Sequence, residues 1–504
     1  MSREGRSFRC RRIQRRGLPI LTLGLAAAFA ACATNPATGK RMLSLVSESQ
    51  EISLGRSYSQ QVEATMSIYD DVELQAYVER VGQSLAATSE RPDLPWSFKI
   101  VDDPVVNAFA LPGGFIYVTR GILTYFDSEA ELASVVGHEI GHVTARHSVE
   151  QMSRAQLGGL VLGVGSALSR GVQRFGGLAQ SGLGVLFLSY SRGDERQADA
   201  LGVRYALRDG YDPREAIKVH EMLGRQTAAR GGSGVPAWLS THPSSADRID
   251  RLRQQLDTIP ASALTGTRIL ADEYLRHVDG VVFGTNPRQG FFEGEVFKHP
   301  DLAFQLTLPR GWQTENLPQA VIAQSPDNDA VIEFKLASGG HAAAARDFFS
   351  QDGVRQRNVS EGSVHGFPAT LGEFEARTNN GTLAGLATFF DYDGHTYRVL
   401  GYTTSDRLET YRPTFSAATN SFDRLKDRAA LEVQPLRIKL VTVQRSTTLA
   451  RMVAGRPSPL NGEDLAILNG IALSDPIEPG RTIKWVVGER PPGRSSNTSG
   501  SDAR

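Results

Sequence analysis

The sequence predicts a multidomain protein: a mostly α domain with a small β-sheet, then an α+β sandwich domain and a small βααβ module. Apolar residues recur at helical spacing from about Glu48 to Leu256. From about Val281 to Phe422 short β-type runs are separated by Gly, Asp and Pro. The last segment, Ile438–Val487, is β-like at both ends and helical between them. We therefore expect domains at residues 48–270, 281–428 and 436–488, a signal peptide at 1–31, a tether at 32–47 and a disordered tail at 489–504.

The composition indicates globular domains and argues against a nucleic-acid partner. The chain has 504 residues, of which 40% are hydrophobic and 22% charged, so it is neither a disordered tail nor a polytopic membrane protein. Lys and Arg together number 55, as do Asp and Glu together. Seven of the arginines lie before Gly17, so the rest of the chain is mildly acidic and has no basic stripe of the kind that binds nucleic acid.

The N-terminus has the pattern of a lipoprotein-type signal peptide. An arginine-rich start precedes the apolar run Leu18–Ala31, which ends at Cys32. This run has 14 residues, fewer than the roughly 20 that a spanning helix needs. The resemblance to bacterial lipoprotein signals implies that Cys32 is lipidated and becomes the first residue, and Ala33 after it implies the outer membrane. An uncleaved membrane anchor is the alternative.

A metal-binding helix is predicted around the motif HEIGH. Ser128 caps this helix and Glu131, three residues on, completes a capping box. His138 and His142 are one turn apart, so both imidazoles can bind one metal ion. Glu139 lies beside them and can act on a metal-bound water. We expect one Zn²⁺ per chain, because imidazole suits zinc.

The third ligand is expected from a second helix about 50 residues later. Glu195 and Asp199 are one turn apart on one face of this helix. Glu195 is the predicted ligand, and Asp199 would orient a ligand histidine through its second ring nitrogen. The alternative is a solvated acidic face paired with Arg192 and Arg196.

Four motifs follow one another along the chain: Asn107–Val118, His138–His147, Glu195 with Asp199, and Thr241–Ile249. Together they resemble the gluzincin zinc metallopeptidases of the HtpX and CAAX-prenyl-protease type, and more closely their exported, bacterial BepA-like branch. The resemblance implies a mostly helical zincin-type fold with His138, His142 and Glu195 as zinc ligands and Glu139 as the catalytic base.

The same resemblance implies further site residues. His242 and Arg248 would act in catalysis, near the substrate or the metal. We expect the strand Phe115–Thr119 to pair with an extended peptide by strand addition. The substrate-binding residues of this prediction are Gly114, Phe115, Ile116 and Tyr117.

Two nearby features have less specific interpretations. His147 follows His142 by five residues, about 140° round the helix, so a structural role is expected rather than ligation. The Gly-rich apolar segment Leu157–Leu188 is too interrupted to span a bilayer. It is interpreted as a mobile lid over the cleft or as a patch that rests on lipid.

The accessory segments are not expected to be catalytic. Histidines of the sandwich domain have no ligand spacing. The segment Ile438–Val487 resembles a LysM module, which implies contact with peptidoglycan sugars. The alternative is that it packs on the other domains or binds protein.

The function expected from these motifs is that of an exported zinc endopeptidase. It would be periplasmic, lipid-anchored to the outer membrane, and would degrade misfolded or stalled envelope proteins. One alternative is an envelope chaperone or scaffold whose proteolysis is secondary or silenced, for example because His242 occupies the open position of zinc. A cell-wall amidase is a third hypothesis, which only the LysM-like segment supports.

Overall fold

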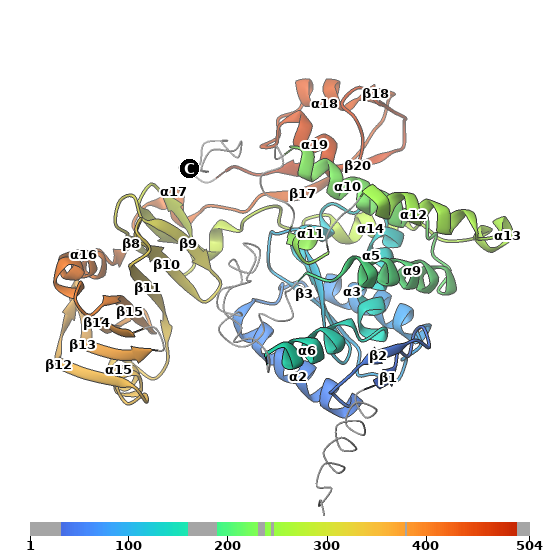
Figure 1. The fold of residues 1–504 in the computed structure, drawn as a ribbon. Coiled ribbons are helices and arrows are strands. Elements are labelled where there is room, and N and C mark those ends of the chain that lie inside the picture. Colours follow the sequence, from blue (N-terminus) through green and yellow to red (C-terminus); the bar gives the residue numbers. More distant parts are fainter. Residues whose placement is uncertain (1–31, 160–188, 230–236, 243–245, 379–380, 491–504) are drawn as a thin grey trace, which may run out of the picture.

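The computed structural model describes residues 32–159, 189–229, 237–242, 246–378 and 381–490. They form an N-terminal domain, a sandwich domain that lies beside it, and a C-terminal module that packs on the N-terminal domain (Figure 1). The predicted signal peptide, most of the Leu157–Leu188 segment and most of the predicted tail lie outside these residues. No helix in the described ranges is long and apolar enough to cross a bilayer.

The predicted tether at 32–47 is wrong, because most of it is a β-hairpin. Strand β1 (Cys32–Thr34) pairs antiparallel with β2 (Arg41–Leu43). The turn between them is held by Asn35, whose side-chain oxygen accepts hydrogen bonds from the backbone nitrogens of Ala37 and Thr38. Asn35 Nδ2 also donates to the carbonyl oxygen of Ala145 at 2.9 Å. The hairpin is therefore fixed to the N-terminal domain.

The N-terminal domain has a three-stranded sheet against which α3 and α5 pack. The strand order is β3-β5-β4, with β3 and β5 parallel and β4 antiparallel to β5. The strands are β3 (Ser97–Val101), β4 (Ala108–Leu111) and β5 (Phe115–Thr119). The helices are α2 (Glu48–Thr65), α3 (Val72–Ala87), α4 (Arg120–Leu123), α5 (Glu129–Thr144), α6 (His147–Gly159), α9 (Arg192–Arg208), α10 (Glu215–Ala229), α11 (Ala237–Thr241), α12 (Ala246–Asp257), α13 (Ala261–Leu264) and α14 (Ala271–Val278).

The N-terminal domain extends past the predicted boundary at residue 270. Helix α14 contributes Tyr274, Leu275 and Val278 to the core of this domain, and Val281 and Val282 belong to it too. These residues are apolar at helical spacing, but the sequence alone does not show which core they enter.

The sandwich domain is built on a seven-stranded antiparallel sheet and a smaller four-stranded sheet. In β14, Ala387 and Phe389 face helix α15, whereas Ala384 and Phe390 face α16 and the smaller sheet. This alternation is the period-2 pattern by which the segment was predicted to be β. The elements are η2 (Pro287–Gln289), β6 (Phe291–Glu293), β7 (Val296–His299), β8 (Phe304–Thr307), β9 (Gln313–Leu317), β10 (Ala320–Gln324), β11 (Ala330–Ala337), α15 (His341–Phe349), β12 (Val354–Val364), β13 (Phe367–Thr378), β14 (Gly381–Tyr392), β15 (His395–Thr404), α16 (Leu408–Asn420), β16 (Asp423–Arg424) and α17 (Arg428–Leu431).

The C-terminal module has two helices between its outer strands. Strands β17 and β20 pair antiparallel. Lys484 of β20 is fully buried, donates to the carbonyl oxygen of Phe126 at 2.8 Å and pairs with Asp127. The module thus packs beside the start of α5. Its elements are β17 (Arg437–Thr442), β18 (Thr447–Thr448), α18 (Leu449–Gly455), α19 (Gly462–Leu468), β19 (Pro476–Ile477) and β20 (Thr482–Val487).

Candidate metal centre

The helix that carries the HEIGH motif lies at the centre of its domain, and all of its residues are buried. Ser128 Oγ accepts a hydrogen bond from the Glu131 backbone nitrogen, as the sequence predicts. The capping box is not completed as predicted, because the Glu131 carboxylate accepts from the Asp127 nitrogen instead. This cap fixes where α5 begins and therefore which faces His138 and His142 occupy.

Glycines bring α5 and α9 into close contact. A Cβ atom on Gly202 would lie 3.0 Å from the His138 backbone nitrogen, and one on Gly141 would lie 3.1 Å from the Ala198 carbonyl oxygen. Both contacts are tight even for a single methyl group. The small residues thus let the two helix backbones approach, and this carries Glu195 to the histidine pair.

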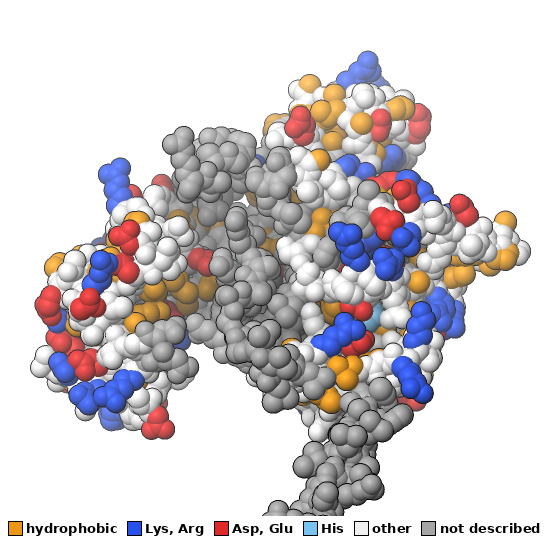
Figure 2. Space-filling model, viewed as in Figure 1, with side chains coloured by type: hydrophobic (Ala, Val, Ile, Leu, Met, Phe, Trp, Pro, Cys, Tyr) orange, Lys and Arg blue, Asp and Glu red, His pale blue; other side chains and the backbone are white. Residues whose placement is uncertain are grey.

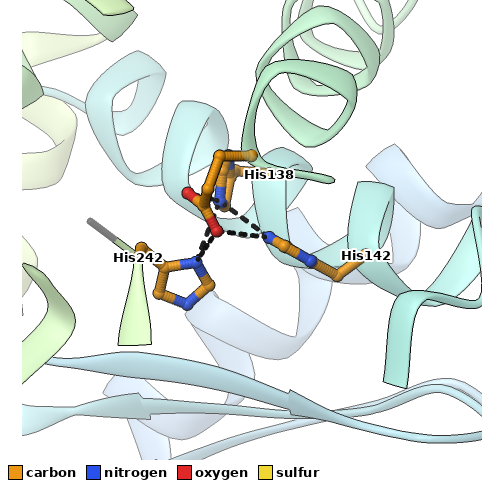
Figure 3. A group of neighbouring side chains, drawn as sticks. His138, His142 and His242 are labelled. Atoms are coloured by element: carbon orange, nitrogen blue, oxygen red, sulfur yellow. Dashed lines mark hydrogen bonds and ion pairs between the residues drawn. The ribbon is translucent and has the colours of Figure 1, made fainter. Parts of the chain in front are cut away.

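Four side chains converge on one point at this contact (Figure 3). His138 Nε2 lies 3.0 Å from His142 Nε2 and 3.3 Å from His242 Nδ1. Glu195 Oε1 lies 3.0 Å from His242 Nδ1 and 3.6 Å from His142 Nε2. Ligand atoms of all four residues lie within 4.8 Å of one another.

This donor set fits a single zinc ion. Ligand atoms about 2.0–2.2 Å from a tetrahedral ion lie about 3.3–3.6 Å apart, close to the separations of these four side chains. Three imidazoles and one carboxylate are also ligands that zinc accepts. Little of the cluster reaches the surface: His138 is 4% exposed, and His142 and His242 are 1% exposed. Figure 2 shows very little histidine colour on the face in view.

A second layer of residues orients the four. The Asp199 carboxylate lies 3.0 Å from His138 Nδ1, which is the contact that its spacing from Glu195 predicted. His147 Nδ1 lies 3.0 Å from His142 Nδ1, and His147 Nε2 lies 2.6 Å from Gln197 Oε1. His147 is thus outside the ligand cluster and beside one of its members. Partners of this kind fix the ring orientation of a ligand histidine.

Arg248 lies near the metal cluster, where it binds the carboxylates of this site. Its Nε and Nη2 atoms donate to the two Asp199 oxygens at 2.9 and 2.6 Å. Its Nη1 atom lies 2.8 Å from Glu195 Oε2. Burial opposes ionisation of Asp199, but the hydrogen bond to His138 and the charge of Arg248 hold the Asp199 pKa well below its usual range. The guanidinium group of Arg248 therefore contacts both carboxylates that α9 brings to this site.

Glu139 lies beside the cluster and is fully buried. Its Oε1 atom accepts a hydrogen bond from Trp238 Nε1 at 3.2 Å and lies 3.5 Å from His242 Nε2. Its Oε2 atom has no hydrogen-bond partner among the described residues. A buried carboxylate oxygen without a partner is costly, so this atom is suited to receive a proton from a bound molecule.

The predicted substrate strand is in the wrong place in the sheet. Strand β5 lies between β3 and β4, so both of its edges are already paired. Gly114 through Tyr117 are buried. The prediction failed because a strand sequence does not show its position in the sheet order. Among the described strands of this sheet, β3 and β4 are the edge strands.

Sequence reasoning missed two aromatic residues of the site. Trp238 donates to Glu139 and stacks on His242, with ring centroids 5.0 Å apart. Tyr190 packs on His142 with ring centroids 4.0 Å apart. Trp238 precedes His242 by four residues, and this helical spacing is the one signal that could have linked it to the site.

The comparisons with known proteins agree with this geometry. The model of "Peptidase family M48" matches residues 73–256. The chain is 31% identical to the beta-barrel assembly-enhancing protease of Yersinia pestis over 335 residues, which are 61% of this chain and 68% of the relative. The protein of the same name from Escherichia coli K12 is 31% identical over 247 residues, 47% of this chain and 50% of the relative.

A second group of relatives is mitochondrial. The mitochondrial metalloendopeptidase OMA1 of Arabidopsis thaliana is 38% identical over 187 residues, which are 37% of this chain and 37% of the relative. The chain thus covers less than two thirds of two of these three relatives. The match over 68% of the Yersinia pestis protein and the family model over the metal cluster together show that the chain belongs to peptidase family M48.

Proposed function

We propose that this chain is an exported zinc-dependent endopeptidase that degrades misfolded or stalled proteins of the cell envelope. The buried cluster of His138, His142, Glu195 and His242, with Glu139 beside it, carries the proposal. The printed names of the relatives, a protease that enhances β-barrel assembly and a metalloendopeptidase, support it.

His138, His142 and Glu195 are the proposed zinc ligands. Burial raises the pKa of Glu195, but His242, His138 and Arg248 outweigh this effect and lower it below its ordinary value, so the carboxylate is ionised at neutral pH. A zinc ion held there would act as a Lewis acid on the scissile carbonyl group and would lower the pKa of water towards about 7.

Glu139 is the proposed general base. Its Oε2 atom takes the proton from the attacking water and then delivers it to the nitrogen of the leaving amine. Trp238 Nε1 holds the other oxygen at 3.2 Å, so the carboxylate keeps one orientation through both transfers. An extended substrate would pair with the edge of β4, because β5 has no free edge.

One observation favours the second candidate function, a scaffold with silenced proteolysis. His242 Nδ1 lies among the ligand atoms of the other three residues, so four protein groups surround the metal position. Catalytic zinc sites have three protein ligands and keep one position open, whereas structural sites are closed by four. In this state His242 would have to withdraw before a substrate could bind.

Casein cleavage separates these two functions. We expect the wild-type chain to cleave casein and a zinc chelator to stop it. Glu139→Gln should lower kcat by about 10²–10⁴-fold and keep zinc bound, because it removes the base and no ligand. The control is Glu409→Gln on α16, whose side chain is 79% exposed and far from zinc. Wild-type protein that binds zinc but does not cleave, combined with cleavage by His242→Ala, would support the scaffold instead.

The cellular location is proposed from the N-terminus. Lipidated Cys32 would be the first residue of the β1-β2 hairpin, which the Asn35–Ala145 hydrogen bond fixes to the N-terminal domain. The anchor would then hold the enzyme close to the outer membrane, on its periplasmic side. Labelling with a radioactive fatty acid, lost in Cys32→Ser, is the test.

The C-terminal module is proposed to be LysM-like. Its βααβ order and the antiparallel β17-β20 pair support this. Contact with peptidoglycan would place the enzyme beside the cell wall, and retention of the chain on purified peptidoglycan tests it. Unfolded or misassembled envelope proteins are the proposed substrates, and Glu139→Gln should trap them.

A further inference from the structure

A small cavity is lined by His138, Asp199 and His220. Its volume is about 20 Å³, and its polar lining residues are Ser134, His138, Asp199, His220 and Trp238. A site of about 10–15 Å³ is enough for one water molecule when two or more polar groups face it. Both conditions are met, so the size and the lining suit one ordered water.

His220 faces Asp199 across a distance that a water would bridge. The His220 Nε2 atom lies 3.9 Å from Asp199 Oδ1, which is too far for a direct hydrogen bond. A water molecule can bridge two polar groups that are separated by more than about 3.5 Å. Both side chains are buried, with 6% and 9% of their surface exposed, so bulk water is not available as their hydrogen-bond partner.

His220 is neutral in this position. Burial lowers the pKa of His220 to about 3, and the charge of Arg248 lowers it too. A neutral imidazole offers one N–H donor and one nitrogen acceptor. It can therefore donate to a water that in turn donates to an oxygen of Asp199. The ring centroid of Trp238, which also lines the cavity, lies 5.9 Å from that of His220.

We propose that one buried water joins His220 to Asp199, and that His220 is thereby a positioning residue for the zinc ligand His138. The chain of contacts runs from His220 through the water to Asp199, and from Asp199 to His138 Nδ1 at 3.0 Å. This inference rests on the proposed zinc site. Loss of the direct carboxylate partner of a ligand histidine typically costs 10–100-fold in metal affinity or activity. Loss of a partner that acts through one water should lower metal affinity or activity less, by about three- to tenfold.

The test compares two substitutions of His220 in the full chain. His220→Phe keeps the ring and its packing on Trp238 but cannot bind the water, whereas His220→Gln can donate to it. We expect His220→Phe to raise the zinc dissociation constant, measured by chelator competition, by about three- to tenfold, and His220→Gln to restore it. With zinc saturating, kcat should fall in His220→Phe while KM for casein stays unchanged. Met222→Leu, a buried change of similar volume on the same helix, should alter neither quantity.

Three results would overturn the inference. Wild-type zinc affinity and kcat in His220→Phe would do so, as would an equal loss in His220→Gln. If either variant fails to fold, a high-resolution crystal structure of the wild type decides, because it must show a water within hydrogen-bond distance of both His220 and Asp199. Wild-type protein that binds no zinc would instead contradict the proposed function itself.

Discussion

The N-terminal and sandwich domains use their histidines in opposite ways. In the N-terminal domain five of them are buried within or near the metal cluster: His138, His142, His147, His220 and His242. In the sandwich domain they are dispersed. His341, for example, forms a hydrogen bond with Thr370 on a neighbouring strand and lies near two exposed acids.

The two cores differ accordingly. The core of the sandwich domain is aromatic, and Phe422 packs on Phe304 and Phe390 with ring centroids 5.2 and 4.6 Å apart. The N-terminal domain instead buries Asp199, Glu195 and Arg248 against one another. Burying charge costs free energy unless it is paired. A core that contains so many ionisable groups is therefore best explained by a metal site, whereas the aromatic core is explained by stability alone.

The buried and the exposed ion pairs should respond very differently to loss of an arginine. Arg248→Leu leaves two buried carboxylates without a cation, so we expect a loss of about 3–5 kcal/mol in the free energy of unfolding, together with weaker zinc binding. Arg412→Leu breaks the partly exposed pair with Glu373 and should cost about 1 kcal/mol or less. Urea unfolding measures both. Equal losses of stability in the two variants would show that burial does not determine how much each ion pair contributes.

Disruption of the aromatic core should destabilise the sandwich domain without changing the affinity for zinc. Phe422 is fully buried, and Phe422→Ala removes its ring contacts, so we expect a loss of about 3–5 kcal/mol in the stability of the sandwich domain. Zinc affinity should stay at the wild-type value, because the metal cluster belongs to the other domain. The check is domain-resolved unfolding by hydrogen exchange, alongside chelator competition. Zinc loss in this variant would mean that the two domains are coupled.

Acid should destabilise both domains through neutral histidines, of which His220 is buried and His299 is half-buried. Burial lowers the pKa of His220 to about 3 and that of His299 to about 4. Below the ordinary pKa of 6.5 the unfolded chain binds a proton that the folded chain does not, so stability falls as the pH falls from 6.5. Between pH 7 and 5 each histidine should account for a loss of about 2 kcal/mol.

Replacing the histidine should remove that share of the loss. Urea unfolding of the metal-free chain measures the loss of stability between pH 7 and 5. We expect a smaller loss than in the wild type for His299→Gln in the sandwich domain and for His220→Gln in the N-terminal domain. His341→Gln, in which a partly exposed histidine is changed, serves as the control. If the stability of His299→Gln depended on pH as much as that of the wild type, this would contradict the neutral state of His299 in the folded chain.

The parts of the site that depend on local spacing could be predicted from the sequence. Residues four apart on a helix face the same way, so the pairing of His138 with His142 and of Glu195 with Asp199 follows from the chain itself. The helices form as expected because their caps and apolar faces are local too. The sandwich strands are likewise predicted by their alternation.

The parts that depend on distant contacts could not be predicted. Strand order placed β5 in the middle of its sheet, and nothing within Phe115–Thr119 shows this. Trp238 and His220 reach the site from α11 and α10, without a motif to mark them. The approach of α9 to α5 depends on Gly202, whose importance appears only when the His138 backbone is seen against it.

The zinc content of the purified chain tests the central claim most directly. Elemental analysis after dialysis should give about one zinc per chain for the wild type, the same for Arg412→Leu, and almost none for Glu195→Ala, which removes a ligand. A wild-type chain without zinc even after loading, or full zinc content in Glu195→Ala, would contradict the account.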